Sequence, residues 1–198
     1  MYTILQKSYS APKVNVKEIL RYAGVKEGDG GISELLKECL IEVENELVYR
    51  VCYAEFNCKI YGEIIDLEFV KINSKNLSSN LKNANKCIVF CATIGAKIDR
   101  LIAKYSVISP LKALLFQAIG AERIESLCNL FNNEIKQSYN AVKPRFSPGY
   151  GDLRVELQRE IIEVLGANKR IGVTLNESLL MSPSKSVTAF IGANSSEK

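Results

Sequence analysis

One short stretch, Arg145-Phe-Ser-Pro-Gly-Tyr-Gly-Asp152, gathers a guanidinium, a hydroxyl, a phenol and a carboxylate. Its glycines and its proline exclude a helix or a regular strand across it. Gly149 and Gly151 flank Tyr150, so the backbone there can approach a ligand without a Cβ in the way. We therefore expect a stiff loop suited to a small polar ligand, for example one with a carboxylate and an aromatic base. A plain glycine-rich connection between two helices is the alternative.

The chain has no histidine among its 198 residues. This removes the commonest general base, the commonest metal ligand and every Ser-His or Cys-His nucleophile pair. The absence argues strongly against a hydrolase of the triad type. We expect no catalytic side chain and no metal site.

The cysteines do not form any Cys-x-x-Cys pair. Cys87 and Cys91 fall in the apolar run 86–93, where strand alternation would put both on one face. We expect buried free thiols rather than a metal site. The six positions are Cys39, Cys52, Cys58, Cys87, Cys91 and Cys128.

The composition, 47% hydrophobic and 24% charged with a net charge of +4, is that of an ordinary globular protein. No dense basic run is interleaved with aromatic residues, so we expect no nucleic-acid partner. The sequence shows neither a signal peptide nor an apolar segment of about 18 residues. We therefore expect a cytoplasmic protein with reduced thiols and no membrane contact.

The N-terminal part predicts two helices. Residues 1–14 show no regular pattern, and Asn15 is a suitable N-cap for a short helix over 16–23. A turn over 28–31 leads to a strongly amphipathic helix over 32–47. We assign the many acidic residues of that helix to a solvated face rather than to a metal site.

Strand patterns follow these helices. The runs 48–56 and 60–69 predict the two strands of a hairpin, and 86–93 is apolar enough to lie centrally in a sheet. The longest predicted helix begins at Ser109-Pro110 and runs to about Tyr139. Gly120 lies inside its apolar face, where close packing, a nearby ligand or simple tolerance are open explanations.

Helices and hairpin strands without regular βαβ alternation predict an α+β fold. A helix over 153–165 and a last strand over 187–191 complete the pattern. We divide the chain into N-terminal helices and a hairpin over 1–84 and a ligand-binding region over 85–198. We interpret both as parts of one domain.

A second stretch, Leu175-Asn-Glu-Ser-Leu-Leu-Met-Ser-Pro-Ser-Lys-Ser-Val187, lies downstream of the loop. The order and separation of the two stretches resemble the activation (reactivation) domain of cobalamin-dependent methionine synthase, most closely its free-standing members. Ala92-Thr-Ile-Gly95, Ile98-Asp-Arg-Leu-Ile102 and 111–123 add to the resemblance. It covers residues 85–192 well and the first 80 residues in general layout.

The resemblance implies a twisted antiparallel sheet flanked by helices, and binding of S-adenosylmethionine. It also implies reductive reactivation of a separately encoded, corrinoid-binding methyltransferase, which contributes the cobalamin. In that family the methyl group comes from S-adenosylmethionine and the electron from a flavoprotein. Such a chain would be inactive alone, as part of a methionine synthase system. Methyl transfer from a sulfonium needs no general base, so the missing histidine is no obstacle.

The resemblance also implies binding residues in the first stretch. Arg145 would pair with the methionine carboxylate of the ligand. Backbone groups of Ser147 and Gly149 would hold its amino-acid or adenine edges. Tyr150 would pack on the adenine or contact the corrin, with a half-buried packing tyrosine as the alternative.

In the second stretch, Glu177 would face the sulfonium or ammonium group or orient the Arg145 loop. An ion pair that anchors Arg145 to Glu177 is the alternative. Lys185 would lie near the docking surface, or be a plain surface lysine. Glu122 and Glu125, on the long helix, are further acidic candidates for the site.

Two residues depart from the family pattern: Asn176 where threonine is usual, and Arg154 where proline is frequent. Two other functions remain open. The first is a docking module that stabilises a corrinoid protein without using S-adenosylmethionine. The second is an ordinary S-adenosylmethionine-dependent methyltransferase. The second lacks support, because no glycine-rich loop follows an early strand.

Overall fold

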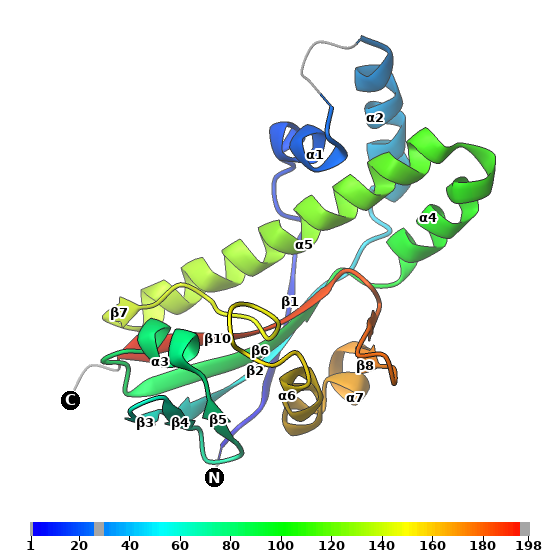
Figure 1. Cartoon of the computed structure of the whole chain (residues 1–198). Coiled ribbons are helices and arrows are strands. Elements are labelled where there is room, and N and C mark those ends of the chain that lie inside the picture. Colours follow the sequence, from blue (N-terminus) through cyan, green and yellow to red (C-terminus); the bar gives the residue numbers. More distant parts are fainter. Residues whose placement is uncertain (1, 26–29, 195–198) are drawn as a thin grey trace.

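The computed structural model describes residues 2–25 and 30–194. Its centre is a five-stranded antiparallel sheet with the strand order β1-β2-β6-β10-β7. The long strands curl across the molecule (Figure 1). The bounds are β1 Leu5–Tyr9, β2 Tyr49–Asn57, β6 Lys86–Thr93, β7 Ala141–Val142 and β10 Ser186–Asn194. The predicted α+β class and the central place of 86–93 are both confirmed.

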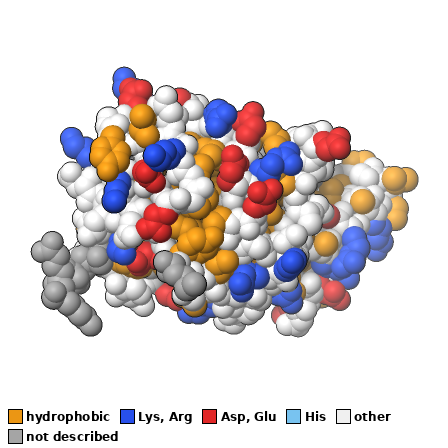
Figure 2. All heavy atoms as spheres, turned by 90° about the horizontal axis from the view of Figure 1, so that it is seen from below, with side chains coloured by type: hydrophobic (Ala, Val, Ile, Leu, Met, Phe, Trp, Pro, Cys, Tyr) orange, Lys and Arg blue, Asp and Glu red, His pale blue; other side chains and the backbone are white. Residues whose placement is uncertain are grey.

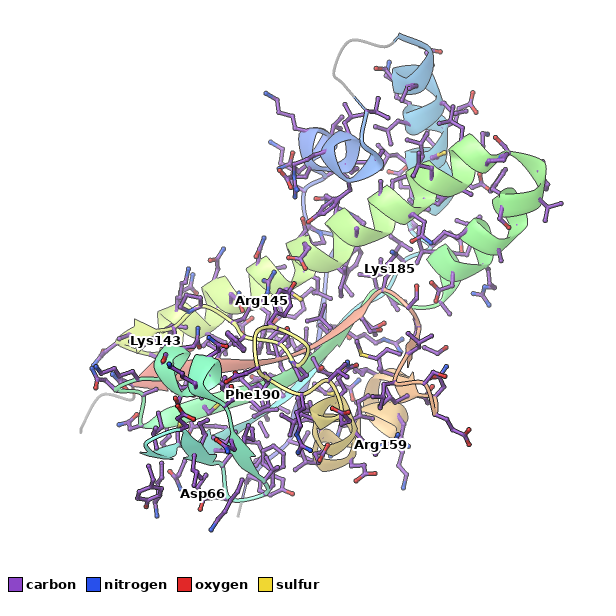
Figure 3. The ribbon with its side chains drawn as sticks, viewed as in Figure 1. Asp66, Lys143, Arg145, Arg159, Lys185 and Phe190 are labelled. Atoms are coloured by element: carbon purple, nitrogen blue, oxygen red, sulfur yellow. The ribbon has the colours of Figure 1, made fainter. Side chains whose placement is uncertain are left out.

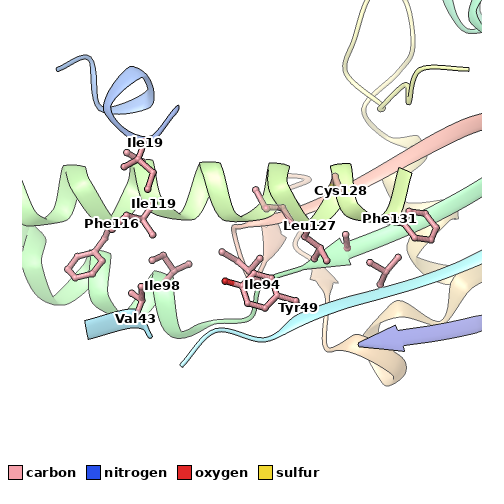
Figure 4. Close-up of a cluster of buried hydrophobic side chains, with 14 of the residues drawn as sticks. Ile19, Val43, Tyr49, Ile94, Ile98, Phe116, Ile119, Leu127, Cys128 and Phe131 are labelled. Atoms are coloured by element: carbon pink, nitrogen blue, oxygen red, sulfur yellow. The ribbon is translucent and has the colours of Figure 1, made fainter. Parts of the chain in front are cut away.

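One face of the sheet is covered by α5 (Pro110–Ser138), the longest helix. Three further helices pack on the N-terminal part of α5 (Figure 1): α1 (Val16–Ala23), α2 (Gly30–Val43) and α4 (Lys97–Ile108). Figure 4 shows how Ile19 of α1 and Ile98 of α4 meet α5 around Ile119. These contacts make one continuous apolar core on this face.

The opposite face has a second core, because side chains alternate along β6. Ile88, Phe90 and Ala92 belong to the core under α5, whereas Cys87, Val89 and Cys91 belong to the other. All six cysteines are buried and free. The prediction that Cys87 and Cys91 share a face is therefore confirmed.

Short elements cover this second face. On the side shown in Figure 2, acidic and basic side chains are interspersed around apolar ones. The elements are α3 (Lys75–Asn80), α6 (Leu157–Leu165) and α7 (Ala167–Ile171), a small sheet of β3 (Lys59–Tyr61), β4 (Ile64–Asp66) and β5 (Lys71–Asn73), and the pair β8 (Thr174–Leu175) and β9 (Met181–Ser182).

The predicted hairpin of 48–56 with 60–69 is wrong. β2 pairs with β1 and β6, which are distant in sequence, and the 60–69 run itself folds back to form β3 and β4. The structure also has a strand, β1, where the sequence indicated irregular chain. Its side chains are largely exposed, so it has no apolar alternation to reveal it.

Helix bounds differ from the predictions at both starts and ends: the helix predicted over 32–47 ends at Val43, four residues early. The cap at Asn15 is confirmed: its side chain accepts a hydrogen bond from the Glu18 N–H at 3.3 Å. The next helix begins at Gly30, inside the predicted turn, whose first residues lie outside the described part of the chain. The helix predicted over 153–165 begins at Leu157, because the preceding residues form turns.

Gly120 is explained by close packing. A Cβ at this position would lie 2.9 Å from Cε of Lys185 and 3.1 Å from Cγ1 of Ile98. The glycine thus allows α5 to approach α4 and the start of β10.

Within residues 2–25 and 30–194, no helix is long and apolar enough to cross a membrane. In the same residues, no three histidine, cysteine, aspartate or glutamate side chains gather so that they could hold a metal ion.

Candidate functional site

A cavity of about 700 Å³ opens where the edge of the main sheet is incomplete. Its lining residues come from α5, the first residues of β10 and the loop that carries Arg145, which is labelled in Figure 3. The residues that line it are Glu125, Asn129, Asn132, Lys136, Val142, Lys143, Pro144, Arg145, Phe146, Ser147, Pro148, Tyr150, Gln158, Met181, Ser186, Val187 and Thr188.

The floor of the cavity is an open strand edge. The chain after β7 pairs with the far end of β10: Lys143 N–H donates to Gly192 O at 2.8 Å, and Phe146 and Phe190 exchange two bonds of 2.8 Å. The backbone N–H and C=O groups on one edge of an antiparallel strand come from alternate residues. Those of Thr188 therefore point to the same side as those of Phe190, which bond to Phe146. They face the cavity, ready for a ligand with an edge of donors and acceptors.

One wall is a polar stripe on α5. Glu125, Asn129, Asn132 and Lys136 recur at helical spacing and so line one face of the helix. The cavity lining has three basic side chains, Lys136, Lys143 and Arg145, and one acidic side chain, Glu125. The excess of positive charge suits a ligand with a carboxylate.

Arg145 reaches this stripe from the loop. Its Nη1 donates to Oδ1 of Asn129 at 2.9 Å, and its Nη2 donates to the carboxylate of Glu125. The side chain of Arg145 keeps only 20% of its surface exposed. These partners fix the direction of the guanidinium and leave its other N–H groups for a planar anion.

The middle of the loop is folded on itself. Gly149 has a φ of +92°, and its N–H donates to Leu153 O at 2.8 Å. That donor is therefore used within the loop, and the expected contact of a ligand with backbone groups of Gly149 stays a prediction. Tyr150 is 68% exposed at the cavity rim, with its ring centre 6.5 Å from that of Phe146.

The end of the loop is bound to another element. The carboxylate of Asp152 accepts hydrogen bonds from the Ser74 hydroxyl and from the N–H groups of Lys75 at 2.7 Å and Asn76 at 3.2 Å. The Ser74 bond and these N–H groups, at the start of α3, lower the pKa of Asp152. Gly151 fits only because it lacks a side chain: a Cβ would lie 2.4 Å from Oδ1 of Asn76. The Gly-Asp part of the motif therefore holds the loop in place.

Two amide oxygens in the lining lack partners among the described residues. Oδ1 of Asn132 and Oε1 of Gln158 are buried without a hydrogen bond. A buried acceptor left unpaired costs free energy, typically about 1–3 kcal/mol. Both residues line the cavity, so a turn of either side-chain amide would present its oxygen to a ligand with N–H donors.

The other predicted residues lie elsewhere. Glu177 is exposed in the connection between β8 and β9, outside the cavity lining, and no ion pair between it and Arg145 occurs among the described residues. Glu122 is buried in an ion pair with Arg123, whose guanidinium also donates to Pro12 O and Lys13 O. That pair holds the N-terminal segment on α5.

Lys185 points away from the cavity. Its Nζ donates to Oε1 of Gln117 at 2.7 Å, and its stem packs on Gly120. Figure 3 shows Lys143 and Lys185 at opposite ends of β10. Burial lowers the pKa of Lys185. The structure thus brings Arg145, Ser147, Tyr150 and Glu125 together, and places Lys185 at the packing of β10 on α5.

Sequence reasoning missed the polar residues that the helices supply. Asn129, Asn132 and Gln158 lie on helix faces that look solvent-facing in the sequence. One signal was present: amides in place of charges along the stripe of α5, where an exposed helix face usually has Lys and Glu.

Comparisons with known proteins agree with this geometry. Residues 75–198 match the model of a family described as "Vitamin B12 dependent methionine synthase, activation domain". Among solved structures, the chain is similar to the "Crystal Structure of the MetH Reactivation Domain bound to AdoHcy", with a TM-score of 0.70 and 17% sequence identity. The alignment covers 99% of this chain and 80% of that one, and it establishes a shared fold. Among curated proteins, no match is found.

Proposed function

We propose that this chain, which belongs to the family of the vitamin B12 dependent methionine synthase activation domain, binds S-adenosylmethionine in the cavity beside Arg145. Its role would be the reductive reactivation of a corrinoid methyltransferase that is a separate protein. The resemblance to the family seen in the sequence is confirmed. The ligand, the partner and the site residues are our proposal.

The observation that carries the proposal is the position of Arg145. It lies in the cavity lining, held by Glu125 and Asn129, with further N–H groups available for a carboxylate. A guanidinium held in this way loses little freedom on binding an amino-acid carboxylate in a bidentate manner. The α-ammonium of the same ligand would lie beside Glu125 and the unpaired Oδ1 of Asn132.

The rest of the ligand fits the rest of the cavity. The backbone groups of Thr188 present a donor and an acceptor, which is the pattern that one edge of adenine complements. Ser147 and the exposed ring of Tyr150 close the opposite side. Tyr150 would then stack on the base or meet the partner protein.

The partner would be a corrinoid-binding methyltransferase, the methionine synthase core, and it would contribute the cobalamin. The bound ligand would supply an activated methyl group on sulfur, and a flavoprotein would supply the electron. This chain would position the ligand and exclude water around it. The six free thiols agree with a reducing location such as the cytoplasm.

Titration calorimetry of the purified chain with S-adenosylmethionine and with S-adenosylhomocysteine tests the proposal. We expect one-to-one binding of both. Arg145→Ala should weaken binding at least about 30-fold, which corresponds to about 2 kcal/mol for the loss of a charge-assisted pair.

The matched control is Arg159→Ala, since Arg159 is exposed on α6 and lies outside the cavity lining (Figure 3). Its affinity should equal that of the wild type. Equal binding by the folded Arg145→Ala protein would overturn the site assignment. If the wild type binds neither ligand, alone or with a cobalamin-dependent methionine synthase present, the proposed function is wrong and the chain is a docking module.

A further inference from the structure

Gln158 is a buried polar side chain whose acceptor is unused. It is the second residue of α6, only 8% exposed, and its Oε1 has no hydrogen-bond partner among the described residues. Glutamine in such a place is costly unless something pairs with it, because an apolar residue of similar size would fill the space without this penalty. The proposed ligand contacts through Arg145 and Thr188 leave Gln158 unexplained.

The position of Gln158 singles out one part of the site. It lines the main cavity and also a neighbouring cavity of about 680 Å³, to which Leu175, Leu179, Leu180 and Met181 contribute apolar side chains. Met181 is shared between the two cavities as well. Thr174, Asn176, Ser182 and Ser184 also line this second cavity, which has no charged side chain among the described residues of its lining. Gln158 therefore lies where a cavity with charged walls meets an uncharged one.

The two ends of an S-adenosyl ligand differ in the same way. Its amino-acid end is charged and suits the α5 wall, where Arg145, Glu125 and Asn132 lie. Its base is flat and neutral and suits apolar surroundings with a few polar groups. The base carries an exocyclic amino group, a neutral N–H donor that needs a neutral acceptor in a buried place.

Resting on the proposed function, we propose that Gln158 is a specificity-determining residue for the base. Its Oε1 accepts a hydrogen bond from the 6-amino group of adenine, at the junction of the two cavities. The base then lies at this junction beside Met181, which lines both cavities, with the backbone of Thr188 at its other polar edge. A purine without the amino group leaves the acceptor unpaired and binds less tightly.

Two ligands and two proteins make the test. The ligands are S-adenosylhomocysteine and its 6-deamino analogue, in which hydrogen replaces the amino group. The proteins are the wild type and Gln158→Leu, a near-isosteric change that removes the acceptor. The wild type should prefer S-adenosylhomocysteine by about tenfold, a ratio typical of one lost hydrogen bond to a buried group. Gln158→Leu should keep less of this preference than the wild type, because only the Thr188 carbonyl is then left to accept from the amino group, so that the two changes are not additive.

Gln137→Leu is the matched control, because Gln137 is exposed at the end of α5 and outside both cavities. It should keep the wild-type preference. A thermal melt without ligand checks folding, and Gln158→Leu should melt no lower than the wild type, because it removes an unpaired buried oxygen. Gln158→Met serves as a second near-isosteric variant if the leucine protein does not fold.

The outcomes separate this proposal from the function on which it rests. If the wild type binds S-adenosylhomocysteine and Gln158→Leu keeps the full preference for it over the 6-deamino analogue, the role of Gln158 is refuted and the proposed function stands. If the wild type binds neither ligand, the function itself fails and this inference fails with it. Equal affinity of the wild type for both ligands also refutes base selection by Gln158.

Discussion

At the scale of residues, the loop motif divides into two tasks. Arg145 and Tyr150 face the cavity, whereas Gly151 and Asp152 attach the loop to the start of α3. A guanidinium aimed within a fraction of an ångström needs such an anchor, because loops are otherwise poorly fixed. One half of the motif thus lines the cavity, and the other half supports the loop.

The anchor predicts a pH dependence. The hydrogen bonds from Ser74 and the α3 backbone lower the pKa of Asp152 in the folded protein. Its contribution to stability is therefore complete above the unfolded value of about 3.9 and is lost as the pH falls through the lower folded value. Asp152→Asn should lower the melting temperature at pH 7, and the difference in melting temperature between the variant and the wild type should shrink toward pH 3.

Melting temperatures of both proteins across this range provide the measurement. Glu156→Gln removes an exposed carboxylate from the same segment and is the control, with no comparable change expected at pH 7. A deficit of Asp152→Asn that stays constant down to pH 3 would show that the carboxylate charge is not what holds the loop.

At the scale of elements, α5 serves two faces at once. Its apolar residues fill the core against the sheet, and its Glu125-to-Lys136 stripe forms a wall of the cavity. The approach of β10 to this helix depends on Gly120, because the stem of Lys185 occupies the space where a side chain would be.

Gly120→Ala tests that packing. Alanine favours a helix by about 1 kcal/mol, but overpacking of a full site costs about 1–3 kcal/mol. We expect net destabilisation of about 1 kcal/mol in chemical denaturation. In a Lys185→Ala background the obstacle is largely gone, so the same change should be neutral or stabilising. Equal effects in both backgrounds would contradict the assigned role of Lys185.

The elements that sequence reasoning found are those with strong local signals. The helix from Ser109-Pro110 combines a start signal with a long apolar face, and β6 is almost wholly apolar. β1 has no such local signal, because it is held by residues distant in sequence: Lys7 and Tyr9 both donate hydrogen bonds to Glu134 of α5. Such tertiary contacts leave no local pattern in the sequence.

The candidate site, too, could be predicted from the sequence only in part. The glycine-rich loop stands out in the sequence, the resemblance to the family implies roles for Arg145 and Ser147 within it, and the structure places both in the cavity lining. Asn132 and Gln158 could not be found in this way, because their burial depends on how α5 and α6 pack around the edge of β10. Glycine-rich motifs thus reveal the loop of a site, while its walls require the fold.

At the scale of the whole molecule, the sheet separates two cores, and all six thiols are buried in one or the other. Burial raises the pKa of Cys128 to about 12 and that of Cys58 to about 11. With every cysteine buried, access does not favour reaction in the native state, although a hydrogen bond with Cys91 lowers the pKa of Cys52. A thiol reagent at pH 8 should label the folded protein only as fast as it opens, and should label six thiols in denaturant.

Absorbance of a released thiol chromophore measures this directly. Ser79→Cys places an exposed thiol on α3 and should add one rapidly reacting group, which confirms that the reagent is active. Fast labelling of the wild type in the absence of denaturant would show that one of the two cores is open in solution.

The open edge of β10 has a consequence for the order of events during synthesis. The floor of the cavity is made by residues 186–188, which pair with β6 some ninety positions earlier, at Ser186 opposite Thr93. Such pairing over a long sequence separation forms late, because closing the intervening loop costs entropy. The cavity therefore does not exist in a nascent chain that ends before Ser186. A ligand can occupy it only after β10 has been translated and inserted, so a nascent chain without β10 cannot sequester that ligand.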